Sequence, residues 1–173
     1  MSFSIYDASA PVFTNALTNI QAWLDKALAD GKSEAALIEA RLAPDMLPFT
    51  SQIQISSDTA KNAIARLLGV EAPSMPDTEK TFAELKARCQ KTIDYINSFD
   101  RAAFDGAEAR AVQLKFPNGM GYNFTGAQFL TGFALPNFFF HVTTTYALLR
   151  KEGVNLGKPD FLQHLGQPEQ IAA

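Results

Sequence analysis

The chain has 173 residues, and 15 Lys and Arg stand against 18 Asp and Glu, which gives a formal net charge of −3. With 47% hydrophobic and 19% charged residues, the composition is typical of one globular domain, which we expect to span residues 1–173. One Cys and two His exclude a disulfide scaffold and a finger-type zinc site, and the lack of a basic stripe argues against a nucleic-acid partner.

The first half of the chain predicts two long helices. Apolar residues at three- and four-residue steps predict the first from about Tyr6 to Ala29. A short helix is expected from about Glu34 to Arg41, with Ser33 as its N-cap, and a proline-containing connector follows it. The second long helix is expected from about Phe49 to Leu68. Its middle is polar, which indicates either a solvent face or a site, at Gln54, Ser56, Ser57 and Asp58.

The second half predicts two more long helices around a hairpin. The third long helix is expected from about Glu79 to Asn97, with Asp77 or Thr78 as its cap. Alternating residues on both sides of Asn118-Gly119 predict a β-hairpin. The fourth helix, from about Ala127 to Lys151, is the most apolar, and Pro136 is expected to kink it or to break its first turn. A last short helix is expected over 159–165.

These elements predict an all-α fold, an up-down four-helix bundle with a small β-hairpin between helices three and four and short extra helices. Because the fourth helix is apolar nearly all round, either the short helices or a second subunit must cover it, and we expect a homodimer. Residues 125–149 carry no charge, but their Asn, Gln, His and Thr side chains argue against a membrane span. The N-terminus lacks the pattern of a secretory signal, so we expect a cytoplasmic protein.

The strongest candidate site lies on the fourth helix. Asn137 and His141 are four residues apart, which places both side chains on one helix face, the geometry by which a helix presents two ligands to one metal. A carboxamide is a poorer ligand than an imidazole for zinc or nickel. The alternative interpretation is a core histidine that is hydrogen-bonded to its neighbours.

Four stretches of the sequence resemble a known family. They are RLAPDM at 41–46, QIQ at 52–54 with Asp58 and Lys61 beyond it, TFAEL at 81–85 and FALPNFFFHVT at 133–143. On these stretches the chain resembles the DUF1993 family, which is placed in the DinB/YfiT-like superfamily of four-helix proteins.

The resemblance implies a metal site that this chain has partly lost. DinB-like proteins share three histidine ligands, one on the second helix and a His-x-x-x-His pair on the fourth. Counting back from Gly153 in the LRKEG run, His141 matches the last histidine and Asn137 replaces the middle one. The second-helix histidine falls near residues 54–56, which are Gln54, Ile55 and Ser56. Two of the three imidazoles are therefore missing.

Two interpretations of this degenerate site stay open. Asp58, one turn after Gln54, would restore an oxygen ligand, so His141 with Asn137, Gln54 or Asp58 would hold a divalent ion such as Zn²⁺ or Ni²⁺ weakly. Alternatively, the former metal site is a buried hydrogen-bond network. Asp45 either reaches the mouth of the bundle or caps the second helix.

Three functions follow from these alternatives, and whether the chain is an enzyme stays open. The first is a polar interhelical pocket that binds a small molecule, with His141, Asn137, Gln54, Asp58 and Asp45 as candidate binding residues. The second, implied by the resemblance, is a metal-dependent hydrolase or a thiol transferase or isomerase that acts on a small electrophile. The third is a non-catalytic, stress-related dimeric scaffold whose polar core fixes helix register.

Overall fold

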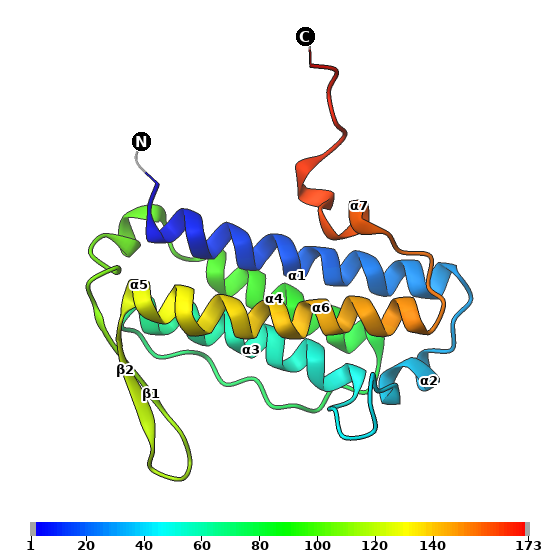
Figure 1. Ribbon diagram of the computed structural model, residues 1–173, viewed down its shortest axis with the longest axis horizontal. Coiled ribbons are helices and arrows are strands. Elements are labelled where there is room, and N and C mark those ends of the chain that lie inside the picture. Colours follow the sequence, from blue (N-terminus) through cyan, green and yellow to red (C-terminus); the bar gives the residue numbers. More distant parts are fainter. Residues whose placement is uncertain (1–2, 172–173) are drawn as a thin grey trace.

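The hydrophobic core lies between four long helices in the computed structural model, which describes residues 3–171 (Figure 1). These helices are α1 (Ile5–Ala29), α3 (Phe49–Leu68), α4 (Phe82–Asn97) and α6 (Leu135–Lys151). Helix α1 packs against α4 and α6, and α3 packs against the same two helices. The aromatic rings of Phe13 and Phe138 meet edge to face in the core, with 4.8 Å between their centroids. The predicted four-helix bundle with a hairpin before its last long helix is confirmed.

Helix α4 runs parallel to α3, a direction that a simple alternating bundle would not have. The rings of Phe49 and Phe82, at the first residues of the two helices, lie 5.8 Å apart, and the hydroxyls of Ser57 and Thr92 meet farther along. The connector between α3 and α4, residues 69–81, makes this possible because it runs back along α3, as Figure 1 shows. The ammonium group of Lys61 fixes it by donating to the carbonyl of Pro73 at 2.8 Å.

Local chemistry sets the ends of the helices. Helix α3 ends at Gly69, as expected, and this residue takes the left-handed conformation with φ +69°. Helix α4 begins with a capping box between Thr81 and Glu84, three residues later than expected, so the predicted caps Asp77 and Thr78 are wrong. The prediction that Asp45 caps the second long helix is also wrong. The residue before α3 is Pro48, whose ring pre-sets the helical entry, and Asp45 lies exposed in the preceding turn.

The segment before α6 is helical but wider than an α-helix. A short helix α5 (Gly126–Phe129) leads into the π-helical segment η2 (Leu130–Ala134), in which the N–H of Leu135 donates to the carbonyl of Leu130. Pro136 follows at the start of α6. Proline lacks an N–H and its ring crowds the carbonyl four residues earlier, and the wider π turn accommodates both effects. The expected kink at Pro136 therefore takes the form of a π-helical segment.

The predicted hairpin is confirmed. Strands β1 (Ala111–Lys115) and β2 (Gly121–Thr125) pair antiparallel and project beyond the bundle (Figure 1). Gly119 in the predicted turn has φ +82°, a conformation that favours glycine. Val112 and Leu114 are buried on the face of β1 that turns toward the helices. The hairpin thus places the side chain of Leu114 beside residues of α3.

Short helices complete the bundle. Helix α2 (Glu34–Glu39) has the expected N-cap, Ser33, and the 3-10 helix η1 (Arg101–Phe104) follows α4. The expected last helix is divided into α7 (Lys158–Phe161) and η3 (Gln163–Leu165). The indole N–H of Trp23 donates to the carbonyl of Asp160 at 3.1 Å and holds α7 on α1. Of the helices in residues 3–171, none is both long and apolar enough to cross a membrane.

Candidate functional site

His141 lies buried on α6 and hydrogen-bonds to a residue that the sequence interpretation did not choose. Its Nδ1 is 2.7 Å from Oε1 of Gln52 on α3. The amide nitrogen of Gln52 donates to the carbonyl of Leu47 at 2.9 Å, so Oε1 must accept and Nδ1 carries the proton. Burial lowers the pKa of His141. The imidazole is therefore neutral at pH 7 and anchored to α3.

Asn137, one turn earlier, also faces α3, as the four-residue spacing predicts. Its amide nitrogen donates to the hydroxyl of Thr59 at 2.9 Å. Because α3 and α6 are antiparallel, the partners of Asn137 and His141 lie two turns apart on α3. The two side chains therefore share a helix face without converging on one point.

The two other candidates on α3 turn toward α4. Gln54 donates to the carboxylate of Glu79 at 2.9 Å, and Asp58 pairs with Arg88 at 2.9 Å and with Lys61 at 3.1 Å. We expected Asn137 and His141 to lie close to Gln54 or Asp58. Gln54 is bonded elsewhere, whereas Asp58 lines the same hollow as Asn137.

The residues present do not fit the three-histidine metal site that the resemblance implies. His141 is the single imidazole on the α3–α6 face, and its Nδ1 proton is directed at an amide oxygen rather than at a cation. The other groups along this face are carboxamides and hydroxyls, which are weak ligands for zinc or nickel, and the carboxylate of Asp58, which is paired with Arg88 and Lys61. Among the described residues, no three His, Cys, Asp or Glu side chains gather closely enough to hold a metal ion.

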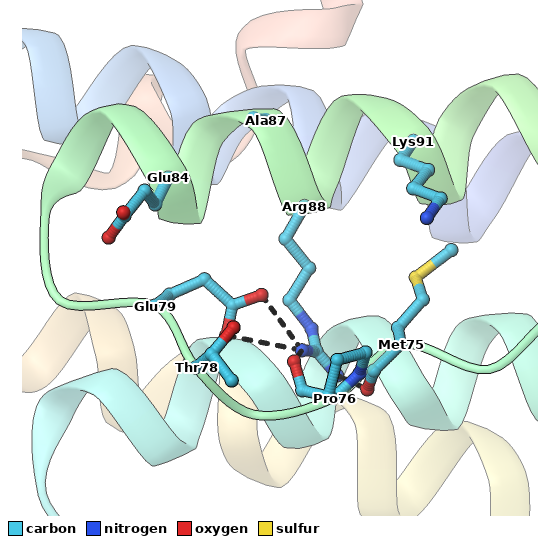
Figure 2. Close-up of a pocket in the computed structure, with 8 residues that line it drawn as sticks. All are labelled: Met75, Pro76, Thr78, Glu79, Glu84, Ala87, Arg88 and Lys91. Carbon is cyan, nitrogen blue, oxygen red and sulfur yellow. Dashed lines mark hydrogen bonds and ion pairs between the residues drawn. The ribbon is translucent and has the colours of Figure 1, made fainter.

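A hollow of about 270 Å³ lies between α4 and the connector, and Arg88 dominates it (Figure 2). The Arg88 side chain is 2% exposed and forms ion pairs with Asp58, Asp77 and Glu79 at 2.9, 2.9 and 3.0 Å. Burial alone would lower the pKa of Arg88, but the hydrogen bond with Glu79 and the surrounding carboxylates raise it. The carboxylate of Glu84 is held in the capping box of α4. Arg88 and Glu79 are thus bonded to each other, and Lys91 lies exposed at the rim of the hollow.

A second hollow, of about 180 Å³, lies where α3, the hairpin and the segment before α6 meet. We call it the Arg66 pocket. Its lining residues come from five elements, α3, β1, α5, η2 and α6, and are Asp58, Thr59, Asn62, Arg66, Leu114, Phe129, Phe133 and Asn137. Phe133 lies in the π-helical segment, and such segments occur frequently at functional sites.

Arg66 is the residue that sequence reasoning missed. Its guanidinium carbon lies 5.8 Å from the centroid of the Phe129 ring, and burial lowers its pKa. A signal for it exists in the sequence, because Asp58, Asn62 and Arg66 recur at four-residue steps and continue the polar face noted at Gln54. Of the other candidates, Asp45 lies exposed outside this pocket.

The comparisons with known proteins identify the fold. The family model described as a domain of unknown function, DUF1993, matches residues 5–162. The chain belongs to the DUF1993 family. A crystal structure of a DinB family member protein from Shewanella denitrificans is similar to this DUF1993 chain, with 36% identity and a TM-score of 0.84. The match covers 98% of this chain and 96% of that one. No curated protein matches the chain. The DUF1993 bundle therefore has an experimental counterpart, and its function must be argued from its pockets.

Proposed function

We propose that this DUF1993 protein binds a small organic molecule in the Arg66 pocket and does so without a metal ion. The observation that carries the proposal is that polar side chains with hydrogen-bonding groups that no other protein group engages lie beside aromatic rings. Within the described residues, the side chains of Asn62 and Arg66 form no hydrogen bond, and Asn137 uses one amide hydrogen on Thr59. Phe129 and Phe133 provide apolar surface beside them. Ligand sites combine these two features.

The other buried polar side chains of the bundle support this choice of pocket, because they differ from those around Arg66. His141 bonds to Gln52, and Ser57 bonds to Thr92 at 2.6 Å, so these inner polar groups satisfy one another. A satisfied network holds helices in register and has little to offer a ligand. We infer that His141 is now a structural residue and that binding takes place one turn away, beside Asn137.

Ring-containing fragments test the proposal directly. We expect amide resonances of residues 58–66 and 129–137 to shift when ¹⁵N-labelled protein is titrated with single-ring carboxylic acids, amides and amines. Asn62→Phe, which fills the pocket, should abolish the shifts, whereas Asn123→Phe on the solvent face of the hairpin should keep them. If no fragment shifts these resonances, or if Asn62→Phe leaves them unchanged, the pocket is not a binding site.

The expected homodimer remains a prediction. The exposed side of α6 includes Phe140, which is 56% exposed and would be covered by a second copy. Light scattering should give the mass of two chains, and Phe140→Glu should give the mass of one. A wild-type mass of one chain would contradict this expectation without affecting the Arg66 pocket.

A further inference from the structure

Arg66 differs from every other arginine of the chain in its hydrogen bonding. Arg88 and Arg101 form ion pairs with carboxylates, and three more donate to backbone carbonyls, namely Arg41, Arg110 and Arg150. The guanidinium of Arg66 has no carboxylate or carbonyl partner in the part of the chain that the structure describes, and contacts the ring of Phe129 instead. Its five N–H donors are therefore available to a ligand.

The pocket presents the positive charge of Arg66, which forms no ion pair with a carboxylate of the described residues. Asp58 is the acidic residue in the lining, but its carboxylate is already paired with Arg88 and Lys61. The lowered pKa of Arg66 has the same origin, since burial disfavours its charge and no nearby carboxylate compensates. An incoming anion would supply the missing compensation.

The apolar side of the pocket favours a ring. The rings of Phe129 and Phe133 are stacked with an interplanar angle of 22° and centroids 6.0 Å apart, and Leu114 of the hairpin is buried beside them. A volume of about 180 Å³ corresponds to roughly six water molecules at about 30 Å³ each. This is below the roughly 300–1,000 Å³ of sites for drug-sized ligands, so the pocket admits a single substituted ring.

We propose that the Arg66 pocket takes a small aromatic monocarboxylate, whose carboxylate binds the guanidinium of Arg66 while its ring packs against Phe129 and Phe133. A carboxylate matches the planar fork of a guanidinium with two parallel hydrogen bonds. The amides of Asn62 and Asn137 lie in the same lining and would bind a polar substituent on the ring. The inference rests on the proposed function and names the class of its ligand.

Matched probes separate the charge from the ring. We would measure binding of benzoate, benzamide and acetate to the full chain by NMR titration at constant ionic strength. Benzoate should bind at least tenfold more tightly than benzamide, which has the same ring without the charge, and than acetate, which has the charge without the ring. Arg66→Gln should weaken benzoate binding at least tenfold, and Lys91→Gln, which removes an exposed cation at the other hollow, should leave it unchanged.

The outcomes distinguish the two proposals. Equal binding of benzoate and benzamide, or benzoate binding that survives Arg66→Gln, would overturn the monocarboxylate assignment and leave the pocket as a binding site for neutral rings. Absence of binding by all the ring compounds would overturn both proposals. The comparison of benzoate with benzamide uses the wild-type chain, so it decides the question even if Arg66→Gln fails to fold.

Discussion

Arg88 and Arg66 lie on neighbouring helices, but carboxylates surround the buried Arg88, whereas the half-buried Arg66 lies against the phenyl ring of Phe129. Arg88 joins Asp58, Asp77 and Glu79, and these contacts hold the connector against α4. Arg66 lies over Phe129, and no acid reaches it within residues 3–171. Burial opposes both charges, yet the pKa of Arg88 is raised and that of Arg66 is lowered. The comparison teaches that the paired charge of Arg88 has a structural role, whereas the unpaired charge of Arg66 is free to take part in the proposed binding.

The largest expected effect is on stability and belongs to Arg88. Arg88→Met should lower the free energy of unfolding by about 3 kcal/mol, because it leaves the carboxylates of Asp58 and Glu79 without their shared partner. Arg66→Met is the matched control and should cost at most about 1 kcal/mol, the value of a cation–π contact. Urea denaturation measures both. Equal losses would mean that Arg66 has an unseen structural partner and would break the comparison.

A smaller loss is expected where His141 and Gln52 hydrogen-bond to each other. Gln52→Leu removes the acceptor for Nδ1 of His141 and should cost about 1–3 kcal/mol, the penalty for leaving a buried polar group unpaired. In a double-mutant cycle with His141→Phe, the second change should cost much less once the first is made. Additive losses would contradict the assignment of this pair as one structural unit.

The pH dependence of stability should identify the same histidine. The pKa of His141 is lower in the folded chain than its ordinary value of 6.5. The unfolded chain therefore binds more protons between those two pKa values, and stability falls as the pH drops below about 6.5. Thermal unfolding between pH 7.5 and 5.5 measures this fall, which His141→Phe should reduce. An unchanged fall in the variant would assign it to another group.

Cys89 reports whether the Arg88 side of the bundle is closed. This thiol follows Arg88 on α4, and burial raises its pKa to about 12, so the reactive thiolate is scarce. We expect a thiol reagent to label native protein only as fast as it opens. Labelling should accelerate in Arg88→Met and stay near the wild-type rate in Arg66→Met. Rapid labelling of the wild type would show that this side of the bundle is open.

The sequence predicted those features that local patterns determine. Apolar periodicity located the four long helices, Asn118-Gly119 located the hairpin, and Gly69 located the end of α3. It also placed Asn137 and His141 on one face. The sequence did not predict that α4 is parallel to α3, because this direction depends on the path of the connector back along α3 (Figure 1), which proline spacing does not specify.

The lining of the Arg66 pocket was predicted only in part. Asp58 and Asn137 do line one hollow, but Asp58 is not the available ligand that it was expected to be, because Arg88, thirty residues later, neutralises it. The unmatched charge of Arg66 is likewise a long-range property. Whether Arg66 has a carboxylate partner depends on where the fold places the acidic residues, and a local sequence pattern does not specify this.

The most direct test of the account is to ask which arginine responds to an aromatic carboxylate. In a titration of ¹⁵N-labelled protein with benzoate, the Nε–H signals of the six arginines can be followed separately and assigned by single Arg→Lys variants. We predict that the Arg66 signal shifts and saturates with benzoate but not with benzamide, while the Arg88 signal stays in place. A stationary Arg66 signal at saturating benzoate would contradict the central claim that its uncompensated charge forms a binding site.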